Sequence, residues 1–330
     1  MKEIFEQIKK SIKVSSETDD YIIIDSVKIK ISKEGFITIR ESIPRRIVCF
    51  IDGGNAALIS APNFAVDIIR AAAVFQDTQR IQKVVVSECI HLARTIDEGK
   101  IIKSICYALK NSEHLPGEIC FAKSDLGSEH DVASTAGVLR RILELNLANN
   151  MVLRLEEGDI LVLDGTLEAK SLIEKEYLEQ LYNSANKKNV LVCGLAKTTT
   201  LLTSRGDAAT VALLKRVPNG TWCFKVGEVC SEMHNAAVFF VKLHNAAKYA
   251  FRLEVSKSQM QTVDIEKLAG YFAYFSKNLA FPGYPYGLVK ADHCARVKNH
   301  ECQSIRTQLV ASLGKEFIPY INSLDAHKYF

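Results

Sequence analysis

RIVCFIDGGNA, residues 46–56, is the stretch of the chain that decides the fold. Its first part is apolar and rich in β-branched residues, which favours a buried strand over residues 46–51. That strand ends on Asp52, and Gly53 and Gly54 follow at once. A carboxylate in this place has two interpretations. Aspartate before glycine is common turn chemistry, and an aspartate at the end of a strand can also belong to a ligand site.

A second predicted strand ends in the same way. DILVLDGT, residues 159–166, closes an apolar run on Asp164 followed by glycine. In open α/β sheets, ligands bind outside the carboxyl ends of the strands. Asp52 and Asp164 are therefore predicted to point into one crevice, although turn chemistry remains the alternative for each aspartate alone.

Composition sets the class of protein and its compartment. The 330 residues are 48% hydrophobic and 24% charged with a formal net charge of +4, which is typical of a globular protein and permits a polyanionic partner. No apolar run is long enough to span a bilayer, and residues 1–13 have the spacing of an amphipathic surface helix. The nine cysteines contain no C-x-x-C pair, so we expect reduced thiols and a cytoplasmic location without membrane attachment. Basic pairs such as Arg140-Arg141 are interpreted as solvated surface.

The order of predicted elements indicates one domain over residues 1–330. An N-terminal helix and an antiparallel β meander are expected over 1–42, and the core over 43–315. In the core the sequence predicts strands at 46–51, 64–76, 80–94, 159–166 and 189–197 and three more within 221–255. It predicts helices at about 128–150, 168–186, 264–277, 286–298 and 301–313.

This order matches an α/β fold with an RNase H-like core, a mixed central sheet flanked by helices. In that fold, metal-binding carboxylates come from the first strand, the first helix, the fourth strand and the last helix. The sequence has an acid at each place: Asp52, Glu144, Asp164 and Asp292. Glu144 is one position from the apolar stripe of its helix, about 100° around the axis, so we expect it to border the buried face. Glu144 and Asp292, each taken alone, have an exposed surface charge as the alternative, as turn chemistry is for the two aspartates that follow strands; the set of four predicts a metal site.

The same residues resemble the NurA nuclease family. The matching motifs are FIDGGNA, RRILELNLA, DILVLDGTLEAK, VLVCGLAKTTTL and GYPYGLVKADHCARV, which span about residues 46–298. Two departures stand out. The family usually has Asp-Gly-Ser in the first motif, whereas this chain has Gly54 in place of the serine. Some members have histidine where Asp292 stands, and His293 follows it here. We favour Asp292 as the C-terminal ligand.

The carboxylate set suits Mg²⁺ or Mn²⁺, because these hard cations select oxygen ligands. Two such ions about 3.5–4 Å apart can activate water and neutralise the leaving oxygen of a phosphodiester. The hypothesis is that Asp52 bridges both ions, that Asp164 and Glu144 hold one, and that Asp292 or His293 helps hold the other. The resemblance adds Tyr284, to orient water or phosphate, and Lys197, to contact the scissile phosphate.

The resemblance implies a metal-dependent deoxyribonuclease with single-strand endonuclease and 5′–3′ exonuclease activity. It also implies a homodimer that works with the hexameric ATPase HerA in DNA end resection and repair. Two alternatives remain open from the residues: an actin-like or sugar-kinase-like ATPase on the same core, and a DNA-binding subunit that has lost its chemistry. Polarity, strand preference and the metal used in the cell are not decided by sequence.

Overall fold

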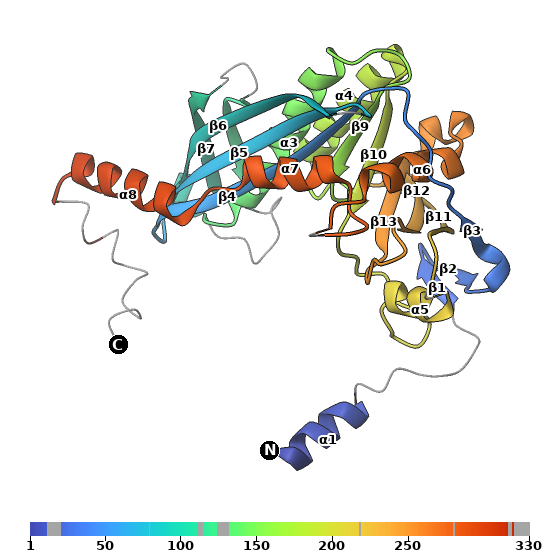
Figure 1. Cartoon of the computed structure of the whole chain (residues 1–330). Helices are drawn as coiled ribbons and strands as arrows, with labels where there is room; N and C mark the ends of the chain where they lie inside the picture. The colour runs from blue at the N-terminus through green and yellow to red at the C-terminus, as the bar shows by residue number, and fades with distance from the viewer. Residues whose placement is uncertain are drawn as a thin grey trace. The chain divides into compact units, whose positions relative to one another are not determined.

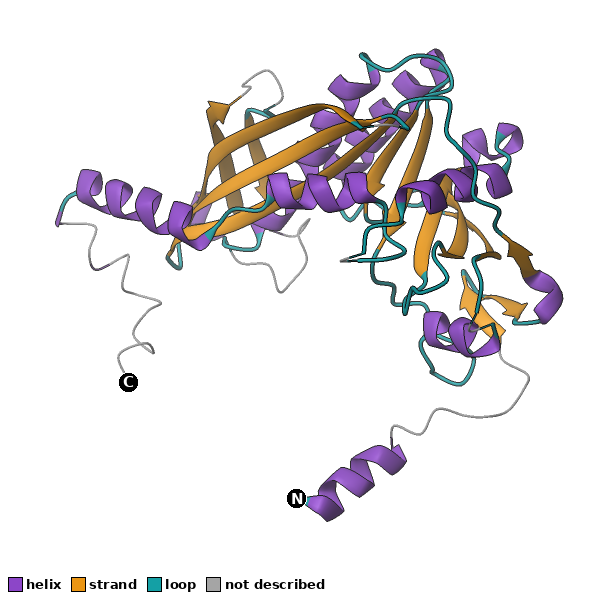
Figure 2. Cartoon of the chain, viewed as in Figure 1, coloured by secondary structure: helices purple, strands orange, loops and turns teal. Residues whose placement is uncertain are grey.

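A computed structural model describes residues 1–11, 21–78, 80–110, 115–123, 132–217, 219–279, 281–315 and 319 (Figure 1, Figure 2). The chain divides into two compact units, each built from two separate segments. The first unit comprises Met1–Ile43 and Gly194–Tyr284, and the second comprises Pro44–Cys193 and Pro285–Phe330. No helix within these described ranges is long and apolar enough to cross a membrane.

The second unit contains a mixed sheet in which strands occur in the order β9-β4-β5-β6-β7-β8. β4 and β9 are parallel, and the other neighbours are antiparallel. The strands are β4 (Val48–Ser60), β5 (Phe64–Gln76), β6 (Ile81–Ile96), β7 (Ile101–Lys110), β8 (Glu118–Ala122) and β9 (Ile160–Asp164), and β10 (Leu191–Ala196) begins in this unit. The residues in the first half of β4 and their partners on β5 are almost all buried. Burial on both faces explains why the sequence of β4 is continuously apolar there.

Helices cover both faces of this sheet. They are α3 (Thr135–Val152), α4 (Leu172–Lys188), α7 (Tyr286–Ala295) and α8 (Asn299–Leu313). A methyl group on Gly53 would overlap the Glu144 side chain of α3, and one on Gly54 would lie 2.6 Å from the carbonyl oxygen of Ala295 in α7. Because neighbouring residues of a strand point to opposite faces, α3 and α7 lie on opposite sides of β4. Figure 1 shows α7 crossing in front of β4 and β5.

Three features of this unit differ from the sequence prediction. β4 does not end at Asp52 but continues to Ser60, because its register with β5 runs unbroken past both glycines as far as Ala57. β7 and β8 extend the sheet beyond the three strands expected. The helix predicted at about 128–150 begins at Thr135 and ends at Val152. The first residues of the predicted span, 128–131, lie outside the described residues.

The first unit contains an antiparallel arrangement of strands in the order β3-β11-β12-β13. Its elements are α1 (Lys2–Ser11), β1 (Tyr21–Ile24), β2 (Val27–Lys30), β3 (Phe36–Thr38), α5 (Ala209–Arg216), β11 (Trp222–Cys230), β12 (Asn235–Lys242), β13 (Phe251–Ser256) and α6 (Ile265–Phe275). α1 is amphipathic and exposed, as predicted.

The predicted N-terminal meander is only partly correct. β1 and β2 form an antiparallel hairpin that is a separate two-stranded sheet. β3 instead pairs with β11, where Phe36 packs against the Trp222 and Phe224 rings at centroid distances of 5.0 and 4.9 Å. The aromatic contacts with β11 explain why β3 leaves the hairpin, because they bury a large apolar area that pairing with β2 would leave exposed.

Candidate active site

Asp52 is buried in β4, at the point where the parallel pairing with β9 finishes. The last parallel pair is Ile51 with Leu163, so Asp52 and Asp164 are the next positions on adjacent strands. Partners in a parallel ladder point to the same face, and this brings the two predicted strand-end aspartates side by side as the sequence indicated. The Gly53 amide donates to Asp52 Oδ1 at 2.7 Å.

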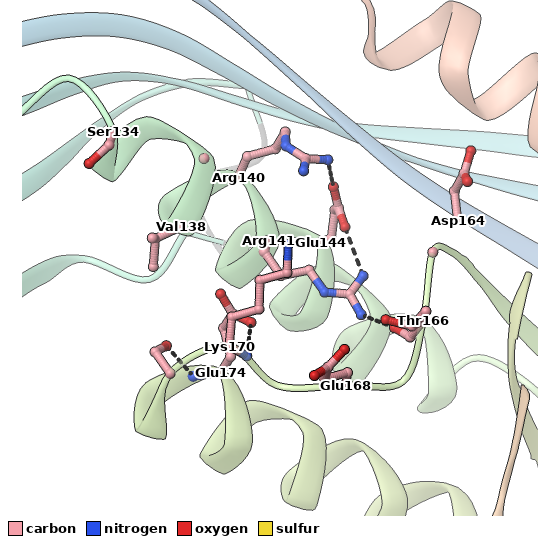
Figure 3. Close-up of a pocket in the computed structure, with 13 residues that line it drawn as sticks. Ser134, Val138, Arg140, Arg141, Glu144, Asp164, Thr166, Glu168, Lys170 and Glu174 are labelled. Carbon is pink, nitrogen blue, oxygen red and sulfur yellow. Dashed lines mark hydrogen bonds and ion pairs between the residues drawn. The ribbon is translucent and has the colours of Figure 1, made fainter. Parts of the chain in front are cut away.

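Glu144 approaches β4 from the other face and is fully buried, with 1% of its surface exposed. The sequence prediction placed it only at the border of the buried face. Its Oε1 accepts from Arg140 at 2.6 Å and its Oε2 accepts from Arg141 at 3.0 Å (Figure 3). A buried carboxylate requires such partners, because removing a lone charge from water is costly in free energy.

The two arginines are functional candidates that sequence reasoning assigned to the solvated surface. Arg140 also donates to the Gly53 carbonyl at 3.2 Å, and Arg141 donates to the Thr166 carbonyl at 2.7 Å. Arg141 therefore connects α3 to the loop that follows Asp164. The spacing of Arg140 and Arg141 from Glu144, i to i+4 and i to i+3, was the signal available in the sequence for this cluster.

Gly53 is the meeting point of the two acids from opposite faces. It donates its amide to Asp52, and its missing side chain leaves the space that the Glu144 carboxylate occupies. Gly54 has a different reason to be glycine. A serine here would place its Cβ 2.6 Å from the Ala295 carbonyl oxygen, so the close approach of α7 explains the departure from the Asp-Gly-Ser pattern.

Asp292 and His293 lie on α7, on the Asp52 side of the sheet. Asp292 is partly buried and its Oδ2 accepts from Arg296 at 2.7 Å, whereas His293 is exposed. Asp292 is therefore the less exposed of the two candidate C-terminal ligands.

Lys197 and Tyr284 lie in the first unit and contact each other. The Lys197 ammonium is 5.0 Å from the centroid of the Tyr284 ring, a cation–π distance. Tyr284 is 0% exposed, and its hydroxyl donates to the Leu195 carbonyl at 3.3 Å. Lys197 is exposed, and the predicted roles of Lys197 and Tyr284 toward a phosphate or water stay predictions.

A cavity of about 340 Å³ opens between α3, the start of α4 and the loop after β9. The charged residues that line it are Arg140, Arg141, Lys170, Glu144, Asp164, Glu168 and Glu174. Burial raises the pKa of Glu174, while the Lys170 amide, which donates to its carboxylate at 2.9 Å, opposes that shift. In Figure 3 the Asp164 carboxylate points away from Glu144, and Thr166 lies beside the Arg141 guanidinium.

Carboxylate oxygens are the ligand type that a hard divalent cation prefers. Asp52 and Asp164 supply carboxylate oxygens from neighbouring positions, and the space beside Gly53 admits a third carboxylate. Yet no group of three or more histidine, cysteine, aspartate or glutamate side chains in the described part of the chain is close enough to hold a metal ion. Glu144 reaches β4 from the face opposite to Asp52, and its two oxygens are paired with Arg140 and Arg141.

Fold and site together define an RNase H-like α/β protein in which two acids lie side by side where the parallel pairing of β4 and β9 finishes. Comparison with known proteins refines this class. The family model of the NurA domain matches residues 46–297. The chain therefore belongs to the NurA domain family. This membership supports the assignment of the protein as a nuclease.

Solved structures agree on the fold. The NurA nuclease from Sulfolobus solfataricus superposes with a TM-score of 0.55 at 13% identity, over 87% of this chain and 90% of that one. A second crystal structure of NurA superposes with a TM-score of 0.52 at 10% identity, over 94% of this chain and 95% of that one. No curated protein sequence matches the chain.

Proposed function

We propose that the protein is a divalent-metal-dependent deoxyribonuclease that hydrolyses phosphodiester bonds at the Asp52 site. The observation that carries this proposal is the placement of Asp52 beside Asp164, with Glu144 reaching the same strand at Gly53. Membership of the NurA domain family supports the choice of nucleic acid as substrate.

The chain's own residues have defined roles in this proposal. Asp52 and Asp164 would hold Mn²⁺ or Mg²⁺ together with Glu144, and Asp292 is the further ligand from α7. The ion would supply Lewis-acid stabilisation of the phosphate and an activated water. Lys197 would pair with a phosphate oxygen as a point charge. Tyr284 would hold Lys197 in place through its ring.

The biological setting is proposed from the family alone. We infer a cytoplasmic homodimer that acts with a HerA-type hexameric ATPase in DNA end resection, as a single-strand endonuclease and a 5′–3′ exonuclease. All nine cysteines are free thiols, which is consistent with a reducing compartment.

The test is a cleavage assay on single-stranded and duplex DNA with and without Mn²⁺. We expect Asp52→Asn to lower the rate about 100-fold or more, because metal-dependent charge stabilisation is worth several kcal/mol and each 1.4 kcal/mol is tenfold. Lys187→Gln, a charge change on the exposed last turn of α4, is the matched control and should leave the rate unchanged. An Asp52→Asn variant with the rate of the wild type would overturn the proposal.

One observation favours a second candidate, a DNA-binding subunit without chemistry. Both oxygens of Glu144 are paired with arginine, as in a purely structural carboxylate. DNA binding by the wild-type protein, with no cleavage in any divalent metal and no Mn²⁺ binding, would identify this case. Hydrolysis of ATP without DNA cleavage would instead identify the ATPase alternative.

A further inference from the structure

We propose that Cys230 and Lys257 form a reversible cross-link in which a single oxygen atom joins the cysteine sulfur to the lysine nitrogen. Both residues lie in the first unit, and neither belongs to the candidate active site. The pair is therefore a modification site that is independent of the proposed nuclease function. Its oxidant is molecular oxygen.

The first observation is the distance between the two reactive atoms. Lys257 Nζ lies 2.8 Å from Cys230 Sγ. This separation falls within the usual range of an N–H···O hydrogen bond, about 2.7–3.2 Å, although sulfur is a larger atom than oxygen. Nitrogen and sulfur are thus closer than a hydrogen bond between them requires, at a separation that one bridging oxygen atom can span.

The second observation is that the two residues come from elements that do not pair with each other. Cys230 is the last residue of β11, and Lys257 is the first residue of η4 (Lys257–Thr262), a 3₁₀ helix directly after β13. β12 lies between β11 and β13 in the sheet. The register places the end of β11 opposite Asn235 and the end of β13 opposite Ala236, so a cross-link would join the two strands past the start of β12.

The third observation is that both side chains are open to an oxidant from solvent. Cys230 is exposed, and the Lys257 side chain is 43% exposed. The hydrogen bond with the Cys230 sulfur, followed by that with Glu228, raises the pKa of the Lys257 amine. Lys257 is therefore held as an ammonium against the sulfur, and an accessible sulfur beside a lysine is the kind that reacts with oxidants.

The reaction balances with one molecule of oxygen. The Cys230 thiol, the Lys257 amine and O₂ give the S–O–N bridge and one water. The S–H bond, one N–H bond and the O–O bond break, while an S–O bond, an N–O bond and the two O–H bonds of water form. Sulfur and nitrogen together lose four electrons, which reduce the two oxygen atoms. A thiolate–ammonium pair contains the same protons as the thiol–amine pair, so the balance is the same from either.

The bridge would connect positions that are 27 residues apart in the chain. A covalent link of this kind stabilises a fold mainly by restricting the unfolded chain. We therefore expect the bridged protein to unfold at a higher urea concentration than the reduced protein. Dithiothreitol returns the four electrons as two dithiols become disulfides, which restores the thiol and the amine and should abolish the shift.

Mass spectrometry tests the proposal on the full chain, kept either in air-saturated buffer or with dithiothreitol. In air we expect the intact protein to gain one oxygen atom and lose two hydrogen atoms, and one of the nine thiols to disappear. After protease digestion, a peptide that joins Cys230 to Lys257 should be found. Dithiothreitol should reverse all three changes.

Two variants should abolish the cross-link. Cys230→Ser removes the sulfur, and Lys257→Arg keeps the positive charge but has no amine to oxidise. Two matched controls should retain it. Lys225→Arg changes another lysine of β11, whose side chain is 56% exposed, and Cys120→Ser removes a different exposed thiol.

Absence of the cross-linked peptide from the wild-type protein kept in air would refute the proposal. A cross-link without the added oxygen atom would identify a direct S–N bond, and oxygen gain without loss of hydrogen would identify a sulfenic acid. Either result contradicts the oxygen bridge, as does a cross-link that persists in Lys257→Arg.

Discussion

At the scale of single residues, Gly53 is the position where the packing of the site leaves no room for a side chain, because an added Cβ would lie 2.4 Å from Glu144 Oε1. The sequence suggested that the glycines leave Asp52 uncovered for a ligand. The structure shows that each glycine admits a particular neighbour, Glu144 at Gly53 and the end of α7 at Gly54. The glycines thus allow two helices to approach one strand from opposite faces, and this approach brings Glu144 up to the strand that carries Asp52.

Gly53→Ala is expected to destabilise the protein by about 1–3 kcal/mol, the usual cost of adding a methyl group to a closely packed site. The new Cβ would overlap the Glu144 carboxylate and disturb its pairs with both arginines. Urea unfolding measures this cost as a lower midpoint with an unchanged slope.

Gly137→Ala is the matched control for that variant. Gly137 lies in α3 and is exposed, and a methyl group added there would meet no side chain of the described residues within 4 Å. Alanine there should stabilise the protein by roughly 0.5–1 kcal/mol, because glycine is a poor helix residue. Equal stability changes in the two variants would show that Glu144 does not depend on the space at Gly53.

At the scale of elements, the sequence predicted most helices and strands of the core but not their extent. β5 occupies 64–76 as predicted, because its apolar and β-branched content favours a strand along its whole length. β4 was predicted too short, since glycines usually signal a turn. The prediction failed because pairing with β5 outweighs the low strand propensity of Gly53 and Gly54.

The site could be predicted in part for similar physical reasons. The adjacency of Asp52 and Asp164 could be predicted because each follows an apolar strand segment that is visible in the sequence, although β4 continues past Asp52 and the metal-binding role of both acids stays a prediction. The burial of Glu144 was missed because it depends on arginine partners and on a glycine in a distant strand. Such burial is set by tertiary packing, which periodicity along one helix does not report.

The N-terminus of α4 allows a test of pH dependence. Ser171 caps the helix by accepting from the Glu174 amide at 3.3 Å, and the buried Glu174 accepts from the Lys170 amide. Burial raises the pKa of Glu174 above its ordinary value of 4.5. The native state then holds this proton at pH values where the unfolded chain has released it, so the contribution of Glu174 to stability falls as the pH rises.

Glu174→Gln removes this titration and keeps an oxygen for the Lys170 amide. We therefore expect the free energy of unfolding of the variant, relative to the wild type, to increase from about pH 4.5 to pH 7. Chemical denaturation across this range measures the difference. Glu176→Gln, an exposed change on the same helix, is the control, and a Glu174→Gln difference that does not vary with pH would contradict the explanation.

At the scale of the whole molecule, the chain crosses between the two compact units three times, after Ile43, Cys193 and Tyr284. Neither unit is a continuous segment, since the first is made of Met1–Ile43 and Gly194–Tyr284. The NurA family match runs across both units. These two observations support the prediction of a single domain over residues 1–330, which we retain as a proposal.

Thiol labelling can test whether the two units unfold as one. Cys49 in the second unit and Cys223 in the first are buried, and burial raises the pKa of the Cys49 thiol and raises the pKa of Cys223 to about 12. Because the thiolate is the reactive form, both should resist alkylation in the native state. Cys120 is exposed and should react without denaturant, which makes it the internal control.

We expect Cys49 and Cys223 to lose protection at the same denaturant concentration. The two units are joined by three chain crossings, and this favours one cooperative transition. Pulsed alkylation followed by mass spectrometry of the labelled peptides gives the midpoint for each cysteine. Two separate midpoints would mean that the units are independent domains, and the RNase H-like site at Asp52 could then be studied apart from Lys197 and Tyr284.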